Sequence, residues 1–110
     1  MLSVSNQAGM YKVIDIAEYW HNKGILPGMV MEECAEVIQA INKYERWKKS
    51  GVEMEDDFER IKVEAGYNNA IANEMGDLLI ILDAYAYING ISYRTMDDHI
   101  AEKLEMEKEV

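Results

Sequence analysis

Apolar residues recur every three or four positions along most of the chain, which is the spacing of one face of an α-helix. One such stripe covers residues 10–22 and a second covers residues 29–49. A third helix is predicted over residues 68–89, and a fourth is predicted from Thr95, a suitable N-cap, to the end of the sequence. The pattern therefore predicts an all-α protein with four helices.

Glycine and proline positions predict where these helices end. Gly24 and the pair Pro27–Gly28 separate the first two helices, Gly51 follows the second, and Gly90 follows the third. The acidic stretch at residues 53–57 is predicted to be a loop or the start of a short helical turn. The sequence contains no repeat or linker, so residues 1–110 are predicted to form a single domain.

The third predicted helix differs from the others because residues 78–82 are apolar on every side. A helix that is apolar all round is buried on all sides. In a four-helix protein this small, such a helix is either central or part of a subunit interface. A chain of 110 residues also buries a modest fraction of its surface, which favours an oligomer.

Charge and cysteine content narrow the classes of function. The net charge is −10, with 21 acidic and 11 basic residues, which argues against binding to nucleic acid. The acidity fits either a solvated surface or a protein that attracts cations. Cys34 is the single cysteine, which excludes an intrachain disulfide and zinc sites built from several thiolates. We find no apolar run long enough to span a membrane and no signal peptide, so the expected location is the cytoplasm, with no membrane partner.

Two pairs of acidic residues stand out on the second and third predicted helices. Glu33 and Glu36 are three residues apart, as are Glu74 and Asp77, and each pair has apolar neighbours. Like charges at this spacing repel each other, and burying them costs several kcal/mol unless a cation compensates. Mg²⁺, with Mn²⁺ as an alternative, is the cation expected for a set of carboxylate ligands that serves a phosphate-bearing substrate. Pairs of this kind also occur on solvated helices, so a plain acidic bundle without metal stays open.

The two motifs also resemble those of a known family. Residues 32–36, with the sequence EECAE, resemble the Glu-Glu-x-x-Glu signature of the MazG-like all-α nucleoside triphosphate pyrophosphohydrolases. Residues 74–77 resemble the second signature, Glu-x-x-Asp, and residues 100–105 are similar to the last helix of that family. The resemblance implies a four-helix bundle completed by dimerisation, as a homodimer or homotetramer. It also implies Mg²⁺-dependent cleavage of a ribo- or deoxyribonucleoside triphosphate to the monophosphate and pyrophosphate.

The same resemblance assigns roles to individual residues. It implies that Glu33, Glu36, Glu74 and Asp77 hold the metal and carry catalysis, and that Lys103 binds substrate phosphate. Lys43 is a second candidate for phosphate binding, because it follows Glu36 by seven residues on the same helical stripe.

Two features of the sequence depart from the family pattern. The segment between the signatures is long, and residues 53–63 are interpreted as a lid or an added contact surface. Where members often carry asparagine in the last helix, this sequence has Glu107. The alternative to an active enzyme is a helical dimerisation or regulatory module that kept the scaffold and lost turnover.

Overall fold

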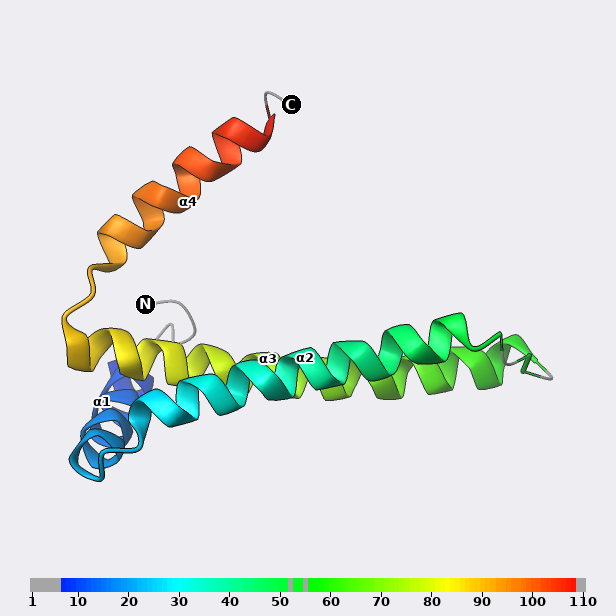
Figure 1. The fold of residues 1–110 in the computed structure, drawn as a ribbon, viewed down its shortest axis with the longest axis horizontal. Helices are drawn as coiled ribbons and strands as arrows, with labels where there is room; N and C mark the ends of the chain where they lie inside the picture. The colour runs from blue at the N-terminus through cyan, green and yellow to red at the C-terminus, as the bar shows by residue number, and fades with distance from the viewer. Residues whose placement is uncertain (1–6, 52, 55, 109–110) are drawn as a thin grey trace.

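The computed structural model describes residues 7–51, 53–54 and 56–108, and these residues form four helices and no strand. The helices are α1 (Gln7–Asn22), α2 (Leu26–Lys49), α3 (Asp57–Asn89) and α4 (Tyr93–Lys108). Helices α2 and α3 run side by side as a long antiparallel hairpin, and α1 lies against one end of it (Figure 1). The prediction of an all-α fold with four helices is confirmed.

Helix α2 begins earlier than the predicted start at Met29. Gly24 has a φ of +72°, and its N–H donates to the carbonyl of His21 at 2.9 Å, which closes the turn after α1. The helix then starts at Leu26, whose side chain is 1% exposed. The prediction of a turn at Pro27–Gly28 was wrong, because proline is tolerated in the first helical turn, where its missing N–H needs no partner.

Helix α3 also begins well before its predicted start at residue 68. Asp56 caps it by accepting a hydrogen bond from the Glu59 N–H at 2.6 Å. The prediction began too late because Gly66 and the asparagines at residues 68 and 69 form helices weakly. Packing against α2 outweighs this weakness, since the ring of Tyr67 stacks 5.7 Å from the ring of Tyr44. From Asp57 onward, the segment interpreted as a lid therefore continues the hairpin as regular helix.

The cap at the start of α3 makes a testable contribution to stability. Asp56→Ala is expected to lower the free energy of unfolding by about 1 kcal/mol, because the Glu59 N–H loses its acceptor. Asp57→Ala is the matched control: it removes an exposed ion pair with Arg60 (3.1 Å) and should cost less than about 0.5 kcal/mol. Urea unfolding measures both, and equal losses in the two variants would argue against the cap.

The hydrophobic core is small and lies where α1 meets the hairpin. Its buried apolar members are Val13, Ala17, Leu26, Ile81 and Ala84. The end of α3 was predicted correctly, because α3 stops at Asn89 and Gly90 follows with a φ of +64°. The core therefore holds the end of the hairpin near α1, and most of the hairpin's length lies beyond it.

Helix α4 leaves the hairpin after Gly90 and runs away from the other three helices (Figure 1). Its start is tied to α3, because the Tyr93 hydroxyl donates to the buried Asp83 carboxylate at 3.3 Å. Ser92, and not the predicted Thr95, acts as its cap: the Thr95 N–H donates to the Ser92 hydroxyl oxygen at 3.1 Å. No helix in the described part of the chain is long and apolar enough to cross a membrane.

A single chain leaves much apolar surface open. The radius of gyration is 17.9 Å, against about 13 Å for a compact protein of this length. Leu104 on α4 is 64% exposed, and Met75 on α3 is 49% exposed. The predicted all-round burial of residues 78–82 holds only in part, because Ile81 is buried while Leu79 and Ile80 are exposed.

Candidate functional site

The antiparallel packing of α2 and α3 brings three acidic side chains together. Glu33 and Glu36 extend from one face of α2, and Glu74 extends toward them from α3. One carboxylate oxygen from each residue lies within 4.8 Å of the other two, and all three side chains are half-buried. We call these three residues the carboxylate cluster. Negatively charged side chains that are far apart in sequence thus lie close together in space.

The carboxylate cluster raises the pKa of its own members. Burial, followed by the charge and hydrogen bond of Glu36, raises the pKa of Glu33 from 4.5 to about 7. The pKa of Glu74 is also raised, first by its hydrogen bond with Glu36 and then by burial. Without a cation, the cluster therefore holds a proton at pH values where an ordinary glutamate has lost it.

Two oxygens of the carboxylate cluster are buried without a partner. Glu33 Oε2 and Glu74 Oε2 are shielded from water and accept no hydrogen bond from any described residue. Buried polar atoms are normally satisfied, so an unsatisfied pair requires an explanation. The donor set consists of carboxylate oxygens only, which suits a hard divalent cation such as Mg²⁺. The residues present therefore fit a site for such an ion.

Asp77, the fourth predicted ligand, lies next to the carboxylate cluster and outside the group of three. It is exposed, one turn after Glu74 on α3, and its charge raises the pKa of both Glu33 and Glu74. Its carboxylate is thus close enough to interact with the cluster. Glu32, the outer glutamate of the first motif, is exposed.

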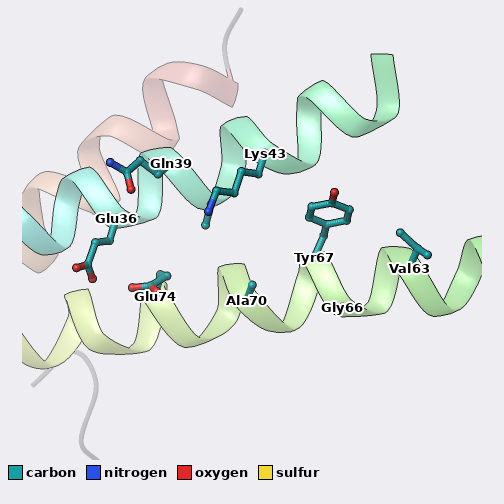
Figure 2. Close-up of a pocket in the computed structure, with 9 residues that line it drawn as sticks. Glu36, Gln39, Lys43, Val63, Gly66, Tyr67, Ala70 and Glu74 are labelled. Atoms are coloured by element: carbon teal, nitrogen blue, oxygen red, sulfur yellow. The ribbon is translucent and has the colours of Figure 1, made fainter. Parts of the chain in front are cut away.

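A cavity of about 680 Å³ extends from the carboxylate cluster along the hairpin (Figure 2). We call it the α2–α3 groove. Its polar lining comes from Glu36, Gln39, Lys43, Tyr67 and Glu74. Apolar and small residues complete its walls: Ala40, Val63, Gly66 and Ala70. The groove therefore joins two members of the cluster to a lysine and a tyrosine.

A second cavity, of about 370 Å³, lies on the other side of the carboxylate cluster, where α1 meets the hairpin. We call it the α1 cavity. Glu33 and Asp77 contribute its acidic lining, and its remaining lining residues are Ile16, Trp20, Met29, Ile80 and Ile81. The α1 cavity is thus largely apolar and contains an indole ring, whereas the α2–α3 groove is more polar.

The two predicted phosphate-binding lysines occupy very different places. Lys43 lines the α2–α3 groove. Lys103 lies on the projecting α4, where it forms an ion pair with Glu107 at 3.1 Å, and it lines neither cavity. Within one chain, the structure therefore brings Lys43 to the cluster and leaves Lys103 outside it.

Sequence reasoning missed two polar residues of the groove, Gln39 and Tyr67. Gln39 follows Glu36 by three residues, and Tyr67 precedes Glu74 by seven, so each shares the stripe of a cluster residue. Helical spacing from the acidic motifs could have identified both. The ring contacts of Tyr67 with Tyr44 and Trp47 depend on how α2 packs against α3, and spacing along one helix cannot predict them.

Taken together, the fold and the site define an all-α protein with a cluster of three carboxylates between two antiparallel helices, which could hold a cation. Residues 23–109 match the family model described as the MazG nucleotide pyrophosphohydrolase domain. The match covers most of the chain, so this protein belongs to that family. No curated protein and no solved structure matches the chain.

Proposed function

We propose that this protein is a Mg²⁺-dependent nucleoside triphosphate pyrophosphohydrolase, which cleaves ribo- or deoxyribonucleoside triphosphates to the monophosphate and pyrophosphate. The observation that carries the proposal is the carboxylate cluster, with three oxygens within 4.8 Å and two of its buried oxygens unpartnered. Membership of the MazG family supports the same reaction class. Mn²⁺ has the same preference for oxygen ligands and is the expected substitute.

The proposed site residues divide into ligands and supporting groups. Glu33, Glu36 and Glu74 would hold the cation, and Asp77 would join them by a change of rotamer on the next turn of α3. When bound, the ion neutralises the negative charge that develops on the phosphate oxygens. Glu33 and Glu74 would have to lose any bound proton to act as ligands, because only deprotonated carboxylate oxygens coordinate a cation well.

The remaining chemistry is a hydrolysis at the α–β anhydride. The oxygen of a water molecule forms a bond to phosphorus while the bond from that phosphorus to the bridging oxygen breaks. A carboxylate of the site accepts the proton of the attacking water, the β and γ phosphates leave together as pyrophosphate, and the α phosphate stays on the nucleoside as the monophosphate. Among the described residues, no histidine or cysteine lines either cavity, so the proposed step uses carboxylates alone.

A panel of nucleotides tests the proposed function directly. Purified protein is incubated with each of the common ribo- and deoxyribonucleoside triphosphates, with Mg²⁺ or with a chelator, and pyrophosphate is detected. We expect release from at least one nucleotide with Mg²⁺ and none with the chelator. Absence of release from every nucleotide would contradict the proposal and would favour a metal-binding module without turnover.

We further propose that the active form is a homo-oligomer built on a dimer. The extended single chain and the projecting α4 support it, because a helix of 16 residues with no packed face is marginal in water. Met96, Ile100 and Leu104 form an apolar stripe along α4. The role predicted for Lys103 in phosphate binding therefore depends on assembly bringing α4 to a carboxylate cluster.

The stripe on α4 can be tested by charge substitution. The double variant Ile100→Asp with Leu104→Asp is expected to convert the oligomer to monomers, because two carboxylates would enter an apolar interface. Thr95→Asp is the matched control, because Thr95 lies on the opposite face of α4. Light scattering after gel filtration measures the mass, and an unchanged mass in the double variant would contradict the role of α4.

A further inference from the structure

The two cavities beside the carboxylate cluster differ in charge. The lining of the α2–α3 groove contains a cation, Lys43, whereas the lining of the α1 cavity contains none. A triphosphate tail is highly negative, and it would lie beside a carboxylate cluster in a chain of net charge −10. Coulomb repulsion therefore favours a path for the tail that carries positive charge, and the groove supplies that charge.

The position of Lys43 suits a phosphate beyond the metal-binding region. It follows Glu36 by seven residues, which corresponds to about 10 Å along a helix axis. Its side chain lies along the groove with its nitrogen directed back toward Glu36 and Glu74 (Figure 2). Lys43 forms no ion pair with any described residue, and its charge is therefore available to a ligand.

The walls of the groove leave space for a chain of phosphates. Gly66 and Ala70 present little side-chain bulk, and a Cβ atom added at Gly66 would meet nothing within 4 Å. Tyr67 lines the groove beyond Lys43, and its ring is held by Trp47 at 5.5 Å and Tyr44 at 5.7 Å. The groove thus begins at Glu36 and Glu74, continues past Lys43 and reaches Tyr67.

We propose that Lys43 binds the terminal phosphate of a nucleoside triphosphate whose phosphate tail lies in the α2–α3 groove, and that this contact makes the enzyme prefer triphosphates to diphosphates. The inference rests on the proposed function. A diphosphate bound at the same carboxylates ends before it reaches Lys43. Lys43 therefore distinguishes substrates by the number of their phosphates and makes no contact with the base.

Kinetics of Lys43→Met test the proposal. With saturating Mg²⁺, kcat/KM is measured for one nucleoside as its triphosphate and as its diphosphate. The ratio of the two values should fall roughly 10- to 100-fold in the variant, the range of a charge-assisted hydrogen bond. An indirect effect on the metal would lower both values together and leave the ratio unchanged. Lys49→Met, an exposed lysine on the same helix, is the matched control, and Lys43→Arg should recover most of the ratio.

Three outcomes overturn the inference. If Lys43→Met leaves the ratio of kcat/KM for triphosphate to that for diphosphate unchanged, Lys43 does not bind the terminal phosphate. A changed preference among bases at constant ratio places the base, and not the phosphate, beside Lys43. The third comes from calorimetry with Mg²⁺ and inorganic tripolyphosphate, which needs no turnover: Lys43→Met should bind about 10-fold more weakly than Lys49→Met, and equal binding overturns the inference. A wild-type protein that cleaves no nucleotide contradicts the proposed function instead.

Discussion

Glu36→Gln is expected to lower the rate of pyrophosphate release by about 100- to 1000-fold. Glu36 contributes one of the three clustered oxygens, and it raises the pKa of both Glu33 and Glu74. An amide removes one negative ligand and places an NH₂ group among oxygens that would hold the cation. Loss of several kcal/mol of charge stabilisation in the transition state corresponds to a decrease of this size.

Glu32→Gln provides the matched control for this variant. It makes the same chemical change four residues earlier on the same helix, at a side chain that is exposed. Its rate is expected to stay within a few-fold of the wild-type rate, and circular dichroism should show both variants equally helical. If Glu36→Gln keeps its activity, or if both variants lose it equally, the carboxylate cluster is not the metal site.

Mg²⁺ is expected to raise the melting temperature by about 10 °C at a concentration 100 times its dissociation constant. An ion that binds only the folded protein adds about 2.7 kcal/mol of stability at that concentration, and small domains gain several degrees per kcal/mol. The physical reason is that the ion relieves repulsion among three carboxylates and satisfies their two unpartnered oxygens. Thermal melting with increasing Mg²⁺ measures the effect, and Glu74→Gln should reduce it strongly.

The metal-free protein should also become less stable as the pH rises. Glu33 has a pKa of about 7 in the folded chain against 4.5 ordinarily, so the folded state binds more protons than the unfolded state between these values. Stability then falls with rising pH, because the slope follows the protons bound by the unfolded state minus those bound by the folded state. The decline should run from about pH 4.5 to pH 7.

Glu33→Gln isolates the origin of this pH dependence. Without metal, the variant should lose less stability than the wild type across the same pH range, and the raised pKa of Glu74 accounts for the decline that remains. Above pH 7 the variant should be more stable than the wild type. Glu32→Gln should retain the wild-type decline, because its side chain is exposed. Stability that rises with pH in the metal-free wild type would contradict the assigned cause.

The length of the hairpin and the position of α4 have consequences for assembly. The core is confined to the end of the hairpin near α1, so most of α3 and all of α4 rely on other contacts for burial. Apolar side chains on both helices remain exposed in the single chain. The proposed oligomer would bury this apolar surface. The same assembly would bring α4, with Lys103, to a carboxylate cluster.

The spacing of apolar, glycine and acidic residues along the sequence was enough to predict an all-α fold. It also predicted where α1, α2 and α3 end and which acidic residues form pairs. Spacing of three residues puts Glu33 beside Glu36 in any helix, and Gly90 ends α3 because it readily adopts a positive φ. The start of α3 could not be predicted, because Gly66 and its polar neighbours disfavour helix locally and are held in one by packing against α2. Such contacts depend on residues far away in the chain.

The distribution of the candidate site residues also depended on contacts between helices. Periodicity along α2 and α3 identifies which carboxylates share a face, but the relative register of the two helices selects which oxygens come within 4.8 Å. That register brings Glu74 into the carboxylate cluster, leaves Asp77 at its edge and places Lys43 in the groove. The direction of α4 after Gly90 likewise separates Lys103 from the site. Spacing within a helix is a local property of the backbone, whereas register and direction are set by side chains that meet across the fold.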